Sequence, residues 1–377
     1  MTSMTSKTGD LADDAAATAR LTIDLGAIAD NWRTMRDLSG EATCGAAVKG
    51  NAYGTGMAEA APVLAKAGCQ HFFVADANEG AALRKLLPDA EIFILSGAFD
   101  AAIPVILDNN LTPVLNSLDQ IAVWRKAGND RPAALHIDTG MNRLGITPAE
   151  AFEIAEVRAF RPTLIMSHFA CADSPDHPLN AKQIERFTEV RSHFPEARAS
   201  LANSAGIHMG EDTHFDVTRP GIALYGGECV NDVKNPMRAV AKAEARILTN
   251  RIAKAGETVS YGGTVTLKRD TRIAICGVGY ADGFHRASSG SGVPLRQALP
   301  QGGMGAVEGH TAPLLGRVTM DLLMFDVTDL PEILGVPGQW LELFGETIAL
   351  DDAARAAGTI GYELLTSLGS RYARRYA

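Results

Sequence analysis

Lys49 is the residue whose type and setting first indicate chemistry. It ends the apolar run 44–49 and is followed by residues 50–56, which include three glycines and Tyr53. A lone lysine at a strand end is more often solvated and without a catalytic role. A half-buried ammonium, however, has a lowered pKa, and its neutral amine is available for Schiff-base chemistry with an aldehyde. The glycines allow close backbone approach and the tyrosine offers a hydroxyl, a combination compatible with a phosphate pocket but not specific to one.

Polar side chains also follow other apolar runs in the first 230 residues. They are Asp138, Arg143, His168, Asn203, Ser204 and Arg219. Taken singly, a histidine on an apolar strand is more often a core residue, and an arginine before Pro-Gly is as often a surface turn residue. If the runs are parallel strands of one barrel, their carboxyl ends share one rim. These side chains would then line a single mouth.

The elements that must position these residues alternate along the chain. Eight short apolar runs predict strands at 44–49, 70–76, 91–97, 111–117, 133–140, 163–170, 197–204 and 217–226. The segments between them carry apolar residues three and four positions apart and often end in Gly or Pro, which predicts amphipathic helices. Eight strands alternating with helices over roughly 200 residues favour an α/β fold, a (β/α)8 TIM-like barrel. A doubly wound open sheet is the alternative.

After about residue 236 this alternation stops. Strand-like runs separated by turn residues predict a second, mainly antiparallel β domain. The small, polar and partly acidic residues at the N-terminus predict a disordered tail. We therefore expect a tail at 1–20, the barrel at 21–236 and the β domain at 237–377.

Composition and charge argue against several classes of function. The 377 residues are 46% hydrophobic and 21% charged, with a net charge of -9 and no basic block, which argues against a nucleic-acid or anionic-membrane surface. No apolar stretch is long enough to span a bilayer, and the N-terminus lacks a signal-peptide pattern. Five cysteines without a C-x-x-C pair predict reduced thiols of a cytoplasmic protein, and no metal site is predicted.

Nine motifs, in order along the chain, resemble those of the alanine racemase family. They are AVKGNAYGTG (47–56), HIDTGMNRLG (136–145), SHFACAD (167–173), NSAG (203–206), RPGIALYG (219–226), VSYGGT (259–264), VGYADG (278–283), GRVTMD (316–321) and TIGYE (359–363). The match runs from residue 21 to the C-terminus. It implies a barrel that binds pyridoxal 5'-phosphate, followed by a β domain. The implied activity is an isomerase that interconverts L-alanine and D-alanine and supplies D-alanine for peptidoglycan.

The resemblance also implies a role for each matching residue. Lys49 would carry the cofactor and act as one acid-base group, and Tyr280 would be the other, from the partner subunit of a homodimer with shared active sites. A racemase needs two such groups because one removes the α-proton and the other returns it from the opposite face. The cofactor would contact Lys49, Tyr53, His168, Asn203, Ser204, Arg219, Gly221, Ile222 and Tyr362, and the substrate would contact Arg143, Met320 and Asp321.

Arg219 would face the pyridine nitrogen of the cofactor, and His168 would pack against the ring and hydrogen-bond toward Arg219. A guanidinium does not give up its proton, so the ring nitrogen should stay unprotonated and the cofactor should be a weak electron sink. Transaminases present a carboxylate at this place. The arginine therefore indicates a racemase, in which a weak electron sink limits side reactions.

The sequence departs from the family pattern at His136, where many members have a carbamylated lysine that orients the arginine equivalent to Arg143. Histidine forms no stable carbamate. Arg143 must then be held by Asp138, by a bound anion such as chloride, or by nothing fixed. Thr319 and Gly361 also replace family residues near the expected substrate entry, so alanine is the favoured substrate but not an assured one.

Three alternatives stay open at this point. A broad-specificity amino-acid racemase is the nearest, because the change at His136 removes a family constraint on substrate binding. A pyridoxal-phosphate-dependent amino-acid decarboxylase would place a carboxylate opposite the pyridine nitrogen and a reactive cysteine in the second domain, and Arg219 and Tyr280 argue against it. A non-enzymatic carrier built from a barrel alone would need neither the β domain nor a second base.

Overall fold

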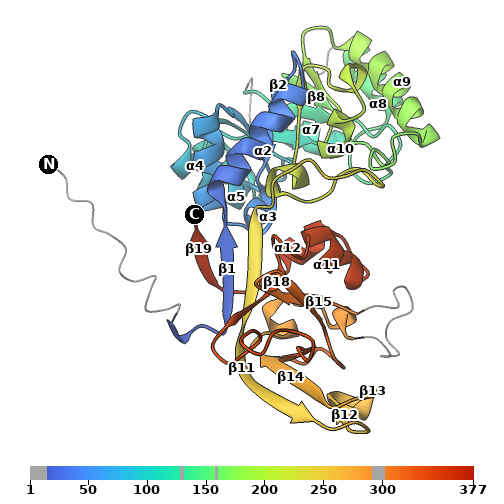
Figure 1. The fold of residues 1–377 in the computed structure, drawn as a ribbon. Helices are drawn as coiled ribbons and strands as arrows, with labels where there is room; N and C mark the ends of the chain where they lie inside the picture. The colour runs from blue at the N-terminus through green and yellow to red at the C-terminus, as the bar shows by residue number, and fades with distance from the viewer. Residues whose placement is uncertain (1–14, 128–130, 158–159, 291–301) are drawn as a thin grey trace, which may run out of the picture. The chain divides into compact units, whose positions relative to one another are not determined.

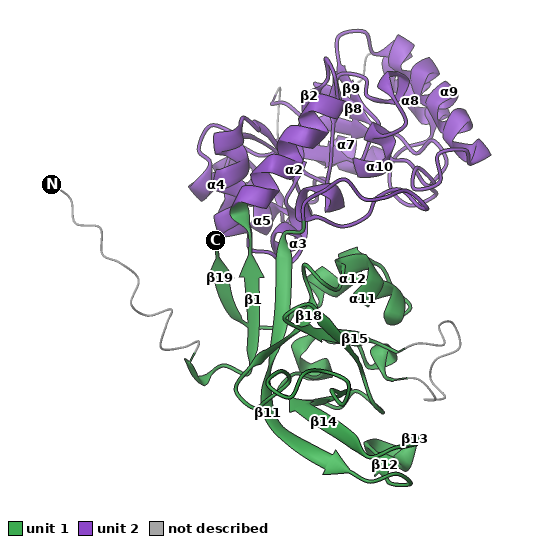
Figure 2. Ribbon diagram, in the orientation of Figure 1, with its two compact units in different colours: residues 1–25, 239–377 green, residues 26–238 purple. Residues whose placement is uncertain are grey.

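Seven parallel strands form the sheet at the centre of residues 26–238, the purple unit of Figure 2. The computed structural model describes residues 15–127, 131–157, 160–290 and 302–377. The seven strands are neighbours in chain order, as parallel strands joined by helical crossovers usually are. They are β3 (Ala46–Ala47), β4 (His71–Val74), β5 (Glu91–Ile94), β6 (Thr112–Leu115), β7 (Ala134–His136), β8 (Leu164–Met166) and β9 (Arg198–Ser200).

The eighth strand of the ring is β10 (Val217–Thr218). On one side, the backbone N–H groups of Asp216 and Arg219 donate to carbonyls in and just after β9. On the other side, β10 pairs in parallel with β2 (Thr43–Cys44), which leads directly into β3. The eight strands therefore close into a (β/α)8 barrel, and the predicted fold class is confirmed.

Amphipathic helices connect the strands and flank them (Figure 1). In α9, for example, Gln183, Phe187 and Val190 are buried at spacings of four and three residues. Side chains mark several helix starts: Asp76 accepts from the second and third N–H groups after it, and Thr147 forms a capping box. The helices are α2 (Leu25–Leu38), α4 (Met57–Ala67), α5 (Ala77–Leu86), α6 (Ile103–Asp108), α7 (Leu118–Ala127), α8 (Pro148–Glu156) and α9 (Pro178–His193).

The long strand β11 (Ala241–Ala253) organises the other unit, residues 1–25 and 239–377, green in Figure 2. Its first half pairs with β1 (Ala19–Ile23) and β18 (Trp340–Phe344), and its second half with β14 (Thr271–Cys276), all antiparallel. The further elements of this unit are β12 (Thr258–Val259), β13 (Val265–Thr266), β15 (Met304–Val307), β16 (His310–Pro313), β17 (Leu323–Asp326), β19 (Ala373–Tyr376), α11 (Leu350–Ala356) and α12 (Gly361–Thr366). Apart from the parallel β1–β19 pair, the ladders described in this unit are antiparallel, as predicted.

The N-terminal strand β1 differs from the prediction. It overlaps the end of the predicted tail at 1–20 and the start of the predicted barrel domain at 21–236. In the structure it pairs with β11 and β19 instead, because its alternating residues Ala19, Leu21 and Ile23 are buried in that sheet. Residues 1–14 of the predicted tail lie outside the described residues.

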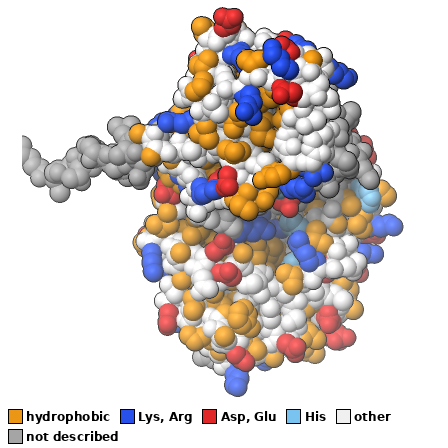
Figure 3. Space-filling view, turned by 90° about the horizontal axis from the view of Figure 1, so that it is seen from below, with side chains coloured by type: hydrophobic (Ala, Val, Ile, Leu, Met, Phe, Trp, Pro, Cys, Tyr) orange, Lys and Arg blue, Asp and Glu red, His pale blue; other side chains and the backbone are white. Residues whose placement is uncertain are grey.

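The surface carries both signs of charge. On the face drawn in Figure 3, Lys and Arg side chains are interspersed with Asp and Glu, and hydrophobic side chains lie between them. Among the described residues, no helix combines the length and the apolar composition needed to cross a bilayer. All five cysteines are free thiols.

Candidate active site

The segment after Lys49 forms an unusual turn. Residues 50–53, in the short element α3 (Lys49–Tyr53), all have φ angles between 54° and 62°, which is the left-handed region. This conformation costs a residue other than glycine roughly 1–2 kcal/mol. Backbone hydrogen bonds of 2.8 Å from Ala52 to Val48 and from Gly54 to Gly50 close the turn. The sequence predicted a glycine-rich pocket here but not the left-handed path, which three non-glycine residues share.

Glu79, which the sequence analysis did not select, holds this turn to the barrel. Its Oε1 accepts hydrogen bonds from the backbone N–H of Gly50 at 2.7 Å and of Asn51 at 3.3 Å. Its Oε2 accepts one from Ala75 at 2.8 Å. Glu79 therefore joins the start of α5 to the Lys49 turn. The only sequence signal for Glu79 is its position three residues after the N-cap Asp76. That position is also typical of an ordinary capping box, so it does not indicate a contact with the Lys49 turn.

The Lys49 ammonium lies in an electropositive mouth. The side chain keeps contact with solvent, but the protein around it still removes enough water to lower its pKa. Burial is the largest cause, and the charges of Arg143 and Arg219 act in the same direction while Glu79 opposes them. A lysine with a lowered pKa provides a neutral amine more readily at neutral pH. We call Lys49, His136, Arg143, His168 and Arg219 the mouth cluster.

Arg219 is 6% exposed, and four acceptors surround its guanidinium. Nη1 donates to the Ser200 hydroxyl, and Nη2 donates to the Ser167 carbonyl at 2.6 Å. Nη2 also lies 3.5 Å from Nδ1 of His168, the contact that the resemblance implied, and 3.4 Å from the Leu201 carbonyl. Burial lowers the pKa of Arg219 to about 9, so the guanidinium stays charged at neutral pH.

His168 is held as a neutral ring. Burial, followed by the charge of Arg219, lowers its pKa well below the usual value. Because a charged guanidinium only donates, Nδ1 of His168 accepts and Nε2 carries the proton. Gln183, which the sequence analysis did not select, donates to the His168 carbonyl at 2.9 Å and fixes this end of β8.

A second group of residues, Asn203, Ser204 and Gly221, forms what we call the Ser204 corner. Asn203 caps the short helix α10 (Ser204–Ile207) by accepting from the Gly206 N–H at 2.9 Å. The Ser204 hydroxyl accepts from the N–H of Gly221 at 2.8 Å, just before the helical turn η2 (Ile222–Tyr225). Two short helical turns therefore begin at this corner, where backbone N–H groups favour an anion.

Tyr53 reaches the same corner from the Lys49 turn. Its ring stacks on Tyr225 with centroids 4.8 Å apart. A Cβ atom on Gly221 would lie 2.3 Å from the Tyr53 hydroxyl, so only glycine at this position lets the hydroxyl approach. The Ser204 corner is thus linked directly to the segment that carries Lys49.

Arg143 projects from a loop that folds back onto the end of β7. Asp138 accepts backbone hydrogen bonds from Gly140 and Met141 at 2.8 Å and from Arg143 at 3.1 Å. Ile146 closes the loop by donating to the His136 carbonyl at 2.9 Å. Asp138 thus holds the backbone of the loop. Among the described residues, no hydrogen bond or ion pair engages the Arg143 guanidinium.

The remaining predicted site residues, Tyr280, Met320, Asp321 and Tyr362, lie in the unit of residues 1–25 and 239–377. Tyr280 begins the 3-10 turn η4 (Tyr280–Asp282) and is 43% exposed. Its N–H donates to Thr319 and the N–H of Ala281 donates to Met320, both at 3.0 Å. Residues 279–283, which we call the Tyr280 turn, therefore pack along residues 319–320. Tyr362 lies in α12.

A buried carboxylate that the sequence analysis did not select fixes the Tyr280 turn. Asp282 is 2% exposed, and its Oδ2 accepts from the Gly279 N–H at 2.8 Å. Arg371 donates to both carboxylate oxygens of Asp282, at 2.6 and 2.8 Å, and to Asp321 at 2.7 Å. One arginine therefore ties the Tyr280 turn to Asp321.

The residues of the barrel mouth fit pyridoxal phosphate. Lys49 offers an amine of lowered pKa for the aldehyde, the Ser204 corner offers hydroxyl and N–H donors for the phosphate, and Arg219 offers a fixed guanidinium. The cationic side chains suit a ligand with a phosphate and a substrate with a carboxylate. The chemistry of the donor set therefore matches the group that the sequence implied.

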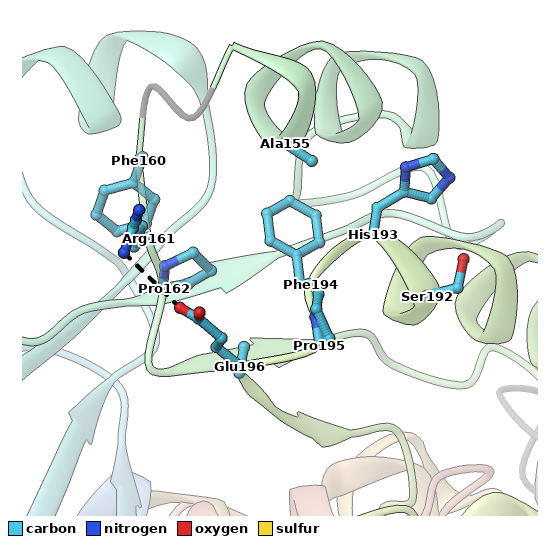
Figure 4. Close-up of a pocket in the computed structure, with 10 residues that line it drawn as sticks. Ala155, Phe160, Arg161, Pro162, Ser192, His193, Phe194, Pro195 and Glu196 are labelled. Atoms are coloured by element: carbon cyan, nitrogen blue, oxygen red, sulfur yellow. Dashed lines mark ion pairs between the residues drawn. The ribbon is translucent and has the colours of Figure 1, made fainter.

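A pocket, drawn in Figure 4, lies at the end of the barrel strands opposite to the mouth cluster. It is lined by residues that precede β8 and β9, including Pro162, Pro195 and Phe194. An ion pair of 3.9 Å joins Arg161 and Glu196 at its edge. Barrel active sites form at the carboxyl ends of the strands. The mouth cluster, not this pocket, is the candidate site.

Two family models match the chain across nearly its whole length. The model described as "Alanine racemase, N-terminal domain" matches residues 23–229, and "Alanine racemase, C-terminal domain" matches residues 240–376. Together they include every predicted site residue.

Similar proteins carry the same family name. The alanine racemase of Rhizobium meliloti (strain 1021) is 53% identical over 96% of this chain and 97% of its own length. The biosynthetic alanine racemase of Agrobacterium fabrum is 52% identical over 96% of this chain and 94% of its own. The crystal structure of alanine racemase from Bartonella henselae with covalently bound pyridoxal phosphate superposes with a TM-score of 0.88. It is 36% identical and covers 96% of this chain and 100% of that one.

Proposed function

The chain belongs to the alanine racemase family, and we propose that Lys49 and Tyr280 are the two residues that move the α-proton of its substrate. The enzyme interconverts L-alanine and D-alanine with pyridoxal 5'-phosphate. The family match thus confirms the predicted activity and cofactor, while the roles of individual residues are our proposal.

The barrel unit would hold the cofactor. Lys49 would carry it through Nζ, and Tyr53, Ser204, Gly221 and Ile222 would surround its phosphate, with Asn203 shaping the Ser204 corner as the cap of α10. Tyr362 would add a hydroxyl from α12. When bound, pyridoxal phosphate supplies an electron sink that makes the α-proton of an amino acid acidic.

Arg219 would present a permanent positive charge to the pyridine nitrogen. Its guanidinium is held by Ser200 and Ser167, and it stays charged at neutral pH. His168 would pack beside the cofactor ring as a neutral imidazole whose Nδ1 faces Arg219. These two residues would keep the pyridine nitrogen free of a proton.

Racemisation needs a proton to leave one face of Cα and return to the other. The Lys49 Nζ would act on one face and the Tyr280 Oη on the other. Arg143 would bind the substrate carboxylate, helped by the backbone of Met320, while Asp321 would support the site through Arg371. The observation that carries this proposal is the place of Lys49 at the carboxyl end of β3, where the protein buries its amine and the charges of Arg143 and Arg219 also lower its pKa.

We further propose a homodimer in which Tyr280 completes the active site of the partner subunit. The Lys49→Ala homodimer should lack activity, and the Tyr280→Phe homodimer should keep at most about 1% of the normal rate. Mixing the two under subunit exchange should restore about one competent site per heterodimer, because an intact Lys49 then meets an intact Tyr280. Two different affinity tags confirm the exchange. Exchange without recovered activity would refute the shared site.

The breadth of substrates tests the remaining alternative, a broad-specificity racemase. A chiral assay of the purified holoenzyme should form D-alanine from L-alanine much faster than D-serine, D-lysine or D-arginine from their L forms. Comparable rates for several substrates would favour the broad-specificity enzyme.

We propose that the enzyme works in the cytoplasm and supplies D-alanine for peptidoglycan. The five free cysteines are consistent with a reducing compartment. The biosynthetic name of the Agrobacterium fabrum relative supports the synthetic role. Depletion of the enzyme should create a requirement for D-alanine in growth medium, and growth without it would contradict this role.

A further inference from the structure

His136 occupies a position from which it can act on the substrate-binding arginine. It is the last residue of β7, it is buried, and the charges of Arg219, Asp138 and Arg143 all act on its ring. The loop that carries Arg143 closes on the His136 carbonyl through Ile146. Nothing in the mechanism above uses this side chain.

Asn116, one strand away, determines which ring nitrogen carries the proton. Asn116 Nδ2 donates to the Leu95 carbonyl at 3.0 Å and to the Val114 carbonyl at 2.8 Å. Because both partners only accept, this end of the amide must be the NH2 group and the other end must be the carbonyl oxygen. That oxygen lies 2.8 Å from Nδ1 of His136, so Nδ1 must donate.

Gln120 keeps this amide in place. Its Oε1 accepts from the Asn116 backbone at 2.9 Å, and its Nε2 donates to the Ser96 carbonyl at 3.1 Å. Burial, followed by the charge of Arg219, lowers the pKa of His136 to about 4. The ring is therefore neutral at physiological pH, with a proton on Nδ1 and a lone pair on Nε2.

Of the three charged side chains that act on the His136 ring, only one has a free donor for that lone pair. Arg219 already faces Ser200, Ser167, His168 and Leu201. The Asp138 carboxylate oxygens accept from three backbone N–H groups of the loop, so this side chain offers no donor. The Arg143 guanidinium has donors to offer and, among the described residues, no hydrogen-bond partner.

We propose that His136 is a positioning residue whose Nε2 accepts a hydrogen bond from the Arg143 guanidinium and turns it toward the substrate carboxylate. The proposal rests on the proposed role of Arg143. It assigns the task to a neutral acceptor on the barrel wall rather than to Asp138 or to a bound anion.

Two variants of His136 separate the role of Nε2 as an acceptor from the role of Nδ1 as a donor. In His136→Asn, the amide nitrogen can still donate to Asn116, but no acceptor stands at the distance of Nε2. In His136→Gln, the side-chain oxygen stands as many bonds from Cα as Nε2 does. We expect His136→Asn to lower kcat/KM for L-alanine about tenfold, mainly through KM, which is the size of one charge-assisted hydrogen bond. We expect His136→Gln to retain most of it, and the reverse order would overturn the proposal.

A double-mutant cycle separates this inference from the proposed function. Arg143→Ala alone should raise KM strongly, and adding His136→Asn to it should cost nothing further. If Arg143→Ala has no effect on KM, the role of Arg143 itself is wrong. If Arg143→Ala raises KM and His136→Asn costs the same in both backgrounds, only the positioning role is wrong.

Two further measurements do not depend on mutant kinetics. The 15N spectrum of histidine-labelled holoenzyme, assigned by the signal lost in His136→Asn, should show a protonated Nδ1 and an unprotonated Nε2. The opposite tautomer would overturn the proposal. The KM of the unmodified enzyme should be the same in chloride-free and chloride-containing buffer, and a KM that falls about tenfold with chloride would assign the role to the anion.

Discussion

The barrel mouth and the Tyr280 turn hold their functional side chains by different means. In the mouth, burial and like charge act on the functional groups themselves: they lower the pKa of Lys49, His136 and His168. At the Tyr280 turn, the tyrosine is 43% exposed, and the buried charge belongs to Asp282, which bonds the backbone.

This difference suggests that the barrel mouth and the Tyr280 turn have different roles. The barrel residues set protonation states, whereas the turn sets the position of one hydroxyl. A substitution in the mouth should therefore change the chemistry of the site, and one near the turn should change geometry with the cofactor still bound. The experiments below test that distinction.

Lys49→Ala should have the largest effect. It removes the amine that carries the cofactor and one of the two acid-base groups, so racemisation should fall below detection. The visible absorbance of covalently held cofactor should disappear with it. Lys182→Ala, an exposed lysine on α9, should change neither property. An unchanged spectrum in Lys49→Ala would remove Lys49 from its role.

Tyr280→Phe should come next, with the opposite spectroscopic result. The cofactor absorbance should remain, because the mouth is intact, while racemisation falls by about 10²- to 10⁴-fold, the usual range for a lost acid-base group. Lys49 can still act on its own face, so α-deuterium should continue to wash out of one enantiomer of alanine. Rapid racemisation by this variant would show that another group returns the proton.

The sequence was sufficient for the fold class and for most of the mouth cluster. Short apolar runs located the barrel strands, and apolar residues three and four positions apart located the helices. Lys49, His168 and Arg219 then stood out as polar residues at the ends of predicted strands. These features are local in the chain. Nine motifs then supplied a family, and the family supplied the cofactor.

Other features depend on contacts that no local pattern reveals. Glu79 looks like the third residue of a capped helix, yet its carboxylate holds the left-handed turn at 50–53. Asp282 and Arg371 are 89 residues apart in sequence. Strand β1 looks like the start of a barrel, and only its pairing with β11 and β19 places it in the other unit.

Asp282→Asn should weaken the turn without affecting the mouth. The substitution removes the charge that Arg371 and the Gly279 N–H share, which should cost about 2 kcal/mol of stability. If the hydroxyl of Tyr280 shifts by about 1 Å, kcat should fall by up to about 100-fold. The cofactor spectrum should stay the same, because the mouth cluster is intact.

Asp321→Asn is the matched comparison for stability. It removes the half-exposed partner of the same Arg371, so its cost should stay within about 1 kcal/mol. Chemical unfolding of both variants measures the two costs. Equal destabilisation by the two substitutions would show that the buried carboxylate has no special role at the turn.

The last expected effect concerns the mouth and appears only when the pH is lowered. The folded state holds His136 neutral, with a pKa of about 4, whereas the unfolded chain binds a proton near pH 6.5. As pH falls below 6.5, the unfolded state therefore takes up the proton first, and stability is lost until about pH 4. His136 alone should contribute roughly 2 kcal/mol of this loss by pH 5, at 1.36 kcal/mol per pH unit. His168 should add to it because its pKa is also lowered.

His136→Asn isolates this contribution, because asparagine does not titrate. The variant should be less stable than the unmodified enzyme at pH 7.5, but the gap should narrow by roughly 2 kcal/mol at pH 5. Chemical unfolding at the two pH values measures it. Asp282→Asn is the control from the other region, because neither His136 nor His168 lies near Asp282 in the chain. The difference in stability between Asp282→Asn and the unmodified enzyme should therefore stay the same at these two pH values. A difference in stability between His136→Asn and the unmodified enzyme that stays constant with pH would mean that the mouth does not hold His136 neutral. The distinction between a region that sets protonation states and one that sets position would then lose its clearest support.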